Sequence, residues 1–180
     1  MKYLHPQFWL RMGLLLALGV LVLASLNTLV PATRADLATA KARAEITQWN
    51  AKGTRLPLAD MVKWRDSLSE GLAHTPDDAL LHSQMGLLFG RYAIQAQAVP
   101  DVSRDFYSQA YQRFDRALTL RPMSAELALN AAVAAEGSGL AKLDDQAKRN
   151  RDLSCRARKY TSPSLALPDR LRALTDGACS

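Results

Sequence analysis

The feature that most constrains this chain is an uncharged and almost wholly apolar segment near its amino terminus, residues 12–33. As an α-helix, its roughly 22 residues are about 33 Å long, which is enough to cross the hydrocarbon core of a bilayer. Phe8 and Trp9 before it and Arg34 after it are residue types that favour membrane interfaces. The sequence therefore predicts a membrane anchor over residues 1–33, with a short basic tail, which contacts the lipid bilayer through residues 12–33.

A cleavable secretory signal is the alternative interpretation of this segment, because Lys2 and Arg11 precede it without any acid. The segment is longer than the ~7–15 apolar residues of an ordinary signal peptide. Its one small-residue cleavage candidate, residues 33–35, contains Arg34 and comes after Pro31. These features favour an uncleaved anchor.

Basic residues beside a span bias its orientation. Here they lie on both sides, with Lys2 and Arg11 before the span and Arg34, Lys41 and Arg43 after it, so the count does not favour a cytoplasmic amino terminus. A short basic tail before a first apolar segment is the usual form of a signal anchor, which exports the domain on its carboxy-terminal side. We expect a single-pass protein of the inner (cytoplasmic) membrane with a periplasmic carboxy-terminal domain.

The rest of the chain has helical periodicity. Residues 34–53 are rich in alanine and lack glycine and proline before Gly53, which predicts a helical stalk that lifts the domain off the bilayer. Across residues 54–180, apolar residues recur at helical spacings between turns, and no segment alternates long enough to form a strand. The predicted fold class is all-α, with helices beginning near residues 58, 79, 103 and 124, and a turn at 99–101. After these we expect a basic helix to about residue 160 and a short closing helix over 168–175.

Two segments share a spacing that is typical of the second helix of a tetratricopeptide repeat. In that pattern small residues let a paired helix approach, a large residue fills the groove beside it, and a proline ends the helix. The residues that carry the pattern are Trp64, Leu68, Gly71 and Pro76 in the first segment, Ala110, Phe114, Ala117 and Pro122 in the second, and Gly86 and Phe89 in the helix after the first proline. We therefore predict a tetratricopeptide-like stack of helical hairpins, with an unrelated helical bundle as the alternative.

The repeat pattern is irregular. The two prolines are about 46 residues apart, against about 34 in a strict array, so we place the extra residues around 92–105 and expect no complete solenoid. Gly86 and Gly90 have the spacing of a close-packing contact between helices.

No motif in the sequence indicates catalysis. A nucleophile elbow, a phosphate-binding loop and a zinc-protease helix motif are all missing from the sequence. His5, His74 and His82 are not spaced as metal ligands with either cysteine. We predict no catalytic, cofactor-binding or metal site, and a protein that is not an enzyme.

The formal net charge is +6, and basic residues gather late in the chain. They form either a solvated helix face or a surface that binds an anionic lipid or polymer. The candidate residues for such a binding surface are Lys148, Arg149, Arg151, Arg156 and Arg158. Nucleic acid is not expected as a partner, because only Tyr160 interleaves the cluster. Cys155 and Cys179 are disulfide partners in an exported domain or ordinary thiols in the cytosol.

The chain resembles the small single-span proteins with a tetratricopeptide-like domain that are encoded with bacterial exopolysaccharide machinery (the VpsP-like group). The span and three segments carry the resemblance: Pro76-Asp77-Asp78-Ala79, Met85-Gly86-Leu87-Leu88-Phe89 and Phe114-Asp115-Arg116-Ala117-Leu118-Thr119-Leu120-Arg121-Pro122. The resemblance implies an accessory role in envelope assembly and no known catalytic residues.

These observations predict a membrane-anchored scaffold for protein–protein interaction, or an accessory factor in cell-envelope assembly, in exopolysaccharide biosynthesis or export. Its expected partners are other membrane or envelope proteins. The alternative functions are an accessory subunit or binder of an anionic polymer or lipid surface through residues 142–159, and a subunit of an envelope enzyme complex.

Overall fold

The computed structural model describes residues 6–52 and 57–140, together with residues 148, 149, 152, 153, 155, 156 and 159. All regular structure in these residues is helical, which confirms the all-α fold class. The helices up to residue 140 are α1 (Pro6–Lys52), α2 (Leu58–His74), α3 (Ala79–Gln95), α4 (Pro100–Leu120) and α5 (Ala125–Ser138).

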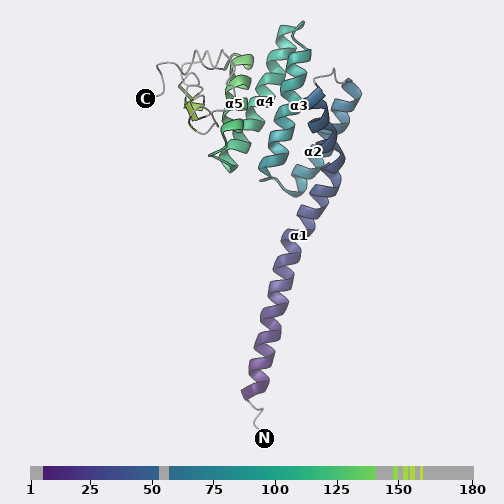
Figure 1. The fold of residues 1–180 in the computed structure, drawn as a ribbon. Helices are drawn as coiled ribbons and strands as arrows, with labels where there is room; N and C mark the ends of the chain where they lie inside the picture. Colours follow the sequence, from purple (N-terminus) through teal and green to yellow (C-terminus); the bar gives the residue numbers. More distant parts are fainter. Residues whose placement is uncertain are drawn as a thin grey trace.

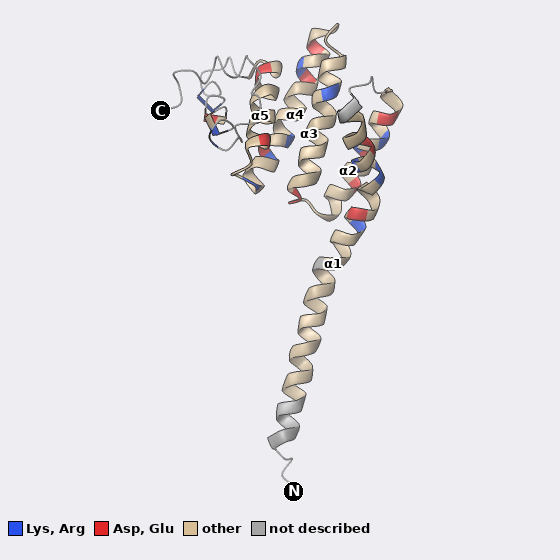
Figure 2. Cartoon of the chain, viewed as in Figure 1, with Lys and Arg blue, Asp and Glu red and all other residues tan. Residues whose placement is uncertain are grey.

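The first half of α1 projects away from the rest of the protein (Figure 1). Its most apolar window has a mean hydropathy of 2.3 and is 0 % buried. In Figure 2 the part of this half whose side chains are described is coloured as uncharged throughout. The hydroxyls of Ser25 and Thr33 donate to the carbonyls of Leu21 and Leu29, at 2.9 Å and 2.8 Å, so they do not stay unsatisfied in an apolar surrounding. As predicted, one helix is long and apolar enough to span a membrane.

The second half of α1 packs against α2. Its buried residues have a spacing of three and four, and they are Ala35, Thr39, Ala42, Ile46 and Trp49. The Trp64 indole donates to the Glu45 carboxylate at 2.5 Å, and the Ser67 hydroxyl donates to the Ala38 carbonyl at 2.5 Å. This segment is therefore the first helix of the domain and not the free-standing stalk predicted for residues 34–53, because one face of it is apolar and covered by α2.

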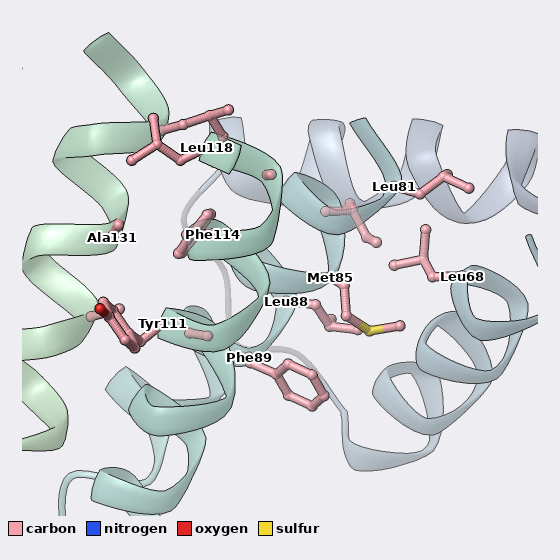
Figure 3. Close-up of a cluster of buried hydrophobic side chains, with 14 of the residues drawn as sticks. Leu68, Leu81, Met85, Leu88, Phe89, Tyr111, Phe114, Leu118 and Ala131 are labelled. Carbon is pink, nitrogen blue, oxygen red and sulfur yellow. The ribbon is translucent and has the colours of Figure 1, made fainter. Parts of the chain in front are cut away.

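From α1 to α5, each helix packs against the next one along the chain, so α2, α3, α4 and α5 lie side by side (Figure 1). Leu68 of α2 and Leu81, Met85 and Leu88 of α3 form the centre of the core, and none of the four is more than 1 % exposed. Figure 3 shows these side chains beside Phe114 and Leu118 of α4. The core is thus built from helices that follow one another in the chain.

The helix ends are set by local side-chain chemistry. Asp78 caps α3 by accepting from the amides of Leu80 and Leu81, at 2.8 Å and 3.2 Å, and Ser124 caps α5. The start predicted at residue 103 is wrong: α4 begins at Pro100, a residue that the first turn of a helix accepts because its missing N–H needs no partner there. Gly139 ends α5 with a left-handed φ of 81°.

The two glycines predicted to form a close contact have different surroundings. A Cβ built at Gly86 would lie 2.7–2.9 Å from the ring of Phe114, whereas a Cβ at Gly90, one turn later, meets nothing within 4 Å. The predicted contact is therefore real at Gly86 and absent at Gly90.

We expect Gly86→Ala to destabilise the domain by about 1–3 kcal/mol, because the new methyl group overfills a site where the ring of Phe114 is itself buried. Gly90→Ala is the matched control in the same helix, and it should be neutral or stabilise by up to about 1 kcal/mol through helix propensity. Denaturation of both variants, monitored by the fluorescence of the buried tryptophans, measures the difference. Equal effects at the two positions would contradict this packing.

Candidate functional site

An apolar groove lies between α3 and α5, with α4 as its floor. We call it the α3–α5 groove. Its volume is about 510 Å³, and its lining residues are Leu87, Gly90, Arg91 and Ile94 of α3, Tyr107 and Phe114 of α4, and Glu126, Asn130, Val133 and Ala134 of α5. A cavity of this size holds one or two large side chains of a ligand.

Two aromatic rings of α4, seven residues apart on one helix face, line the bottom of the groove. The ring of Phe114 lies against Gly86 of α3, and the ring of Tyr107 lies against Gly137 of α5, where a built Cβ would come within 2.5 Å of it. The two glycines therefore let α3 and α5 flank the rings closely, and the floor of the groove is aromatic.

The rims of the groove expose large apolar side chains. Ile94 is 47 % exposed and Val133 is 39 % exposed, and they lie on opposite helices. Exposed apolar groups that converge on one hollow are typical of surfaces that bind a partner.

Polar groups at the edge of the groove are placed to orient a bound segment. The guanidinium of Arg91 lies 5.7 Å from the ring centroid of Trp49, a cation–π distance that fixes it beside the groove. Glu126 and the amide of Asn130 lie on the opposite helix. The groove thus joins an apolar floor with a cation, an acid and an amide, a set that suits a segment of another polypeptide.

The residues predicted to pack the repeats lie mostly in the core. Trp64, Leu68, Gly71, Gly86, Phe89, Ala110, Phe114 and Ala117 are all buried, and Pro76 and Pro122 lie exposed in the turns after α2 and α4. Phe114 serves both the core and the floor of the groove.

Only part of the predicted basic face is described. Lys148 and Arg156 are exposed, Arg149 forms an ion pair with Asp115 of α4, and Arg151 and Arg158 lie outside the described residues. Burial alone would lower the pKa of Arg149, but the charge and hydrogen bond of Asp115, together with the charge of Tyr111, outweigh burial and raise the pKa. One of the predicted interaction cations is therefore engaged in holding the later segment to α4.

Burial raises the pKa of the Tyr111 phenol beside this ion pair, and the charge of Asp115 raises it further. Leu153 is buried as well, so the segment after residue 147 contacts the domain at this point. Cys155 is disulfide-bonded; Cys179 lies outside the described residues, so the pairing of the two stays a prediction.

Among the described residues, no group of three or more histidines, cysteines, aspartates or glutamates is placed to hold a metal ion.

Sequence reasoning did not identify this groove. Leu87 and Ile94 are apolar residues of one helix-forming segment and Val133 lies in another, so the sequence predicts helices there and no groove. The signal was present in α3, whose apolar residues cover a wider arc than a single core-facing stripe needs.

Comparison with known proteins yields no relative: no family model, no curated protein and no solved structure matches this chain.

Proposed function

We propose that this chain is a membrane-anchored scaffold for protein–protein interaction, in which the α3–α5 groove binds a segment of another membrane or envelope protein. The observation that carries the proposal is the groove itself, an apolar hollow of about 510 Å³ with exposed Ile94 and Val133 on facing helices.

The anchor is the apolar half of α1. Leucines and valines on all sides of this half are exposed, for example Leu16 at 68 % and Leu23 at 65 %. A helix that is apolar all round and uncovered by its own domain is stable in hydrocarbon and not in water. We infer single-pass insertion in the inner (cytoplasmic) membrane with the domain in the periplasm.

The helix arrangement supports a tetratricopeptide-like stack. The second half of α1 with α2 makes one antiparallel hairpin, α3 with α4 makes the next, and α5 begins a third. In this register α3 and α5 are both first helices of their hairpins, so the groove lies between equivalent helices of successive repeats. Repeat stacks use such surfaces to bind peptides.

The resemblance to the VpsP-like group indicates the process in which this scaffold acts. We propose that it is an accessory factor in cell-envelope assembly, in exopolysaccharide biosynthesis or export, and that it holds other components of that machinery together without catalysing a reaction.

The experiment is a pair of charge substitutions at two equally exposed valines. Val133 in the groove and Val62 on α2 are each 39 % exposed. In a crosslinked pull-down of the full-length protein from its native membranes, Val133→Glu is expected to reduce recovery of partner proteins at least tenfold, because a carboxylate in the groove opposes an apolar anchor. Val62→Glu should leave recovery unchanged.

The alternative function, binding of an anionic polymer, predicts a different result. A binder of an anionic polymer would bind an anionic glycan in a salt-sensitive way and would lose affinity when Lys148 and Arg156 are changed to glutamate. Salt-sensitive glycan binding without any recovered protein partner would overturn the scaffold proposal.

A further inference from the structure

The packing of α1 on α2 begins immediately after the apolar segment ends. Ala35 is 3 % exposed, and a Cβ built at Gly71 of α2 would lie 2.4 Å from the Thr39 methyl group and 3.6 Å from the Ala35 carbonyl. Because the domain is joined to the apolar half of α1 by continuous helix, little more than one residue separates Thr33 from the packed part.

The α2–α3 loop lies closer still to the span. α2 runs antiparallel to α1, since Trp64 meets Glu45, Ser67 meets Ala38, and Gly71 meets Ala35. It continues past Gly71 to His74, which is about 5 Å further toward the span. Figure 1 shows this loop at the end of the domain from which the first half of α1 projects.

The α4–α5 loop lies at the same end. Arg116 near the end of α4 forms an ion pair with Asp77, and a hollow between the two loops is lined by residues 75–79, Leu120 and Arg121. We call residues 75–78 and 121–124 the membrane-proximal end. The polar headgroups add about 5–8 Å to each side of the hydrocarbon core, so this end falls within their reach.

The groups exposed at this end suit a lipid surface. Met123 is 64 % exposed. Three acids at this end have polar partners: Asp77 pairs with Arg116, Asp36 pairs with Arg43, and Asp78 accepts from the first amides of α3. Arg34 and Arg121 are exposed and have no ion pair within the described part of the chain.

We infer that the membrane-proximal end rests on the bilayer, with Met123 in the interface and Arg34 and Arg121 facing lipid phosphates. This inference depends on the anchoring half of the proposed function and is independent of the partner. It orients the domain: α3 and α5 stand upright on the membrane, and the α3–α5 groove opens sideways, along the bilayer surface, where another membrane protein can reach it.

The test is photo-crosslinking from single sites in the purified full-length protein, reconstituted in vesicles of phosphatidylethanolamine and phosphatidylglycerol. A benzophenone side chain replaces Leu21 in the span, Met123 at the membrane-proximal end, or Val99 in the α3–α4 loop at the opposite end, where the native valine is 53 % exposed. We expect lipid adducts from positions 21 and 123, and at least tenfold fewer from position 99.

Insertion of seven helix-forming polar residues between Thr33 and Arg34 is the decisive control. Two added turns raise the domain by about 10 Å with almost unchanged rotation, so the adduct at position 123 should fall at least tenfold while that at position 21 stays. Adducts at 21 with none at 123, or adducts at 123 that survive the insertion, would overturn the inference and leave the anchor intact. Loss of adducts at 21 as well would reject the anchor itself.

Discussion

Phe114→Ala is expected to lower the free energy of unfolding by about 3–5 kcal/mol. The ring is 3 % exposed, it lies against Gly86 of α3, and it faces Ala131 of α5 (Figure 3). Neither small neighbour can move a side chain into the space that the ring leaves, so a cavity remains. Denaturation of the full-length protein in mild detergent, monitored by the fluorescence of Trp49 and Trp64, measures the loss.

Val102→Ala is the control in the same helix. Val102 is 44 % exposed, so its truncation should change the unfolding free energy by no more than about 0.5 kcal/mol. If Phe114→Ala were as mild as this control, the packing of α4 between α3 and α5, and with it the floor of the groove, would be refuted.

Ile46→Ala is expected to destabilise the domain by about 2–5 kcal/mol, although the residue lies in the segment that the sequence presents as a stalk. Its side chain is 0 % exposed in the face of α1 that packs on α2. The nearby Trp49 and Trp64 rings are 6.3 Å apart at an interplanar angle of 63°, so their fluorescence reports directly on this contact.

Leu37→Ala is the matched comparison, because Leu37 is 76 % exposed in the same helix. It should alter stability by less than about 0.5 kcal/mol. Equal and small effects of both substitutions would show that residues 34–52 stand apart from the domain.

Much of the fold is determined by local sequence. The apolar segment, the helical periodicity, the capping by Asp78 and Ser124, and the prolines after α2 and α4 act over a few residues, and each predicts an element that the structure contains. These signals need no knowledge of which helices pack against each other.

The predictions that fail depend on tertiary packing. The alanine content of residues 34–53 suggested a stalk, yet Ile46 and Trp49 complete a heptad-like stripe with the small residues of that face. The stripe indicates that something covers this face, and only the structure identifies α2 as the cover. The spacing of Gly86 and Gly90 similarly indicates a close contact, but it cannot tell which glycine meets a ring.

The groove was beyond sequence reasoning for a related reason. Ile94 and Val133 are apolar residues in apolar helices, so each is most simply assigned to the core. Their exposure arises because α3 and α5 are held apart by α4, whose Tyr107 and Phe114 rings fill the space between them only at the bottom.

In-cell photo-crosslinking from Val133 tests most directly whether the α3–α5 groove binds a protein segment at the membrane surface. The full-length protein carries a benzophenone side chain at position 133 or, as the control, at position 62. We expect a discrete protein adduct from position 133, absent from position 62 and abolished by Leu87→Glu in the groove wall. The same adducts from both positions, or an adduct at 133 that Leu87→Glu leaves unchanged, would contradict such binding.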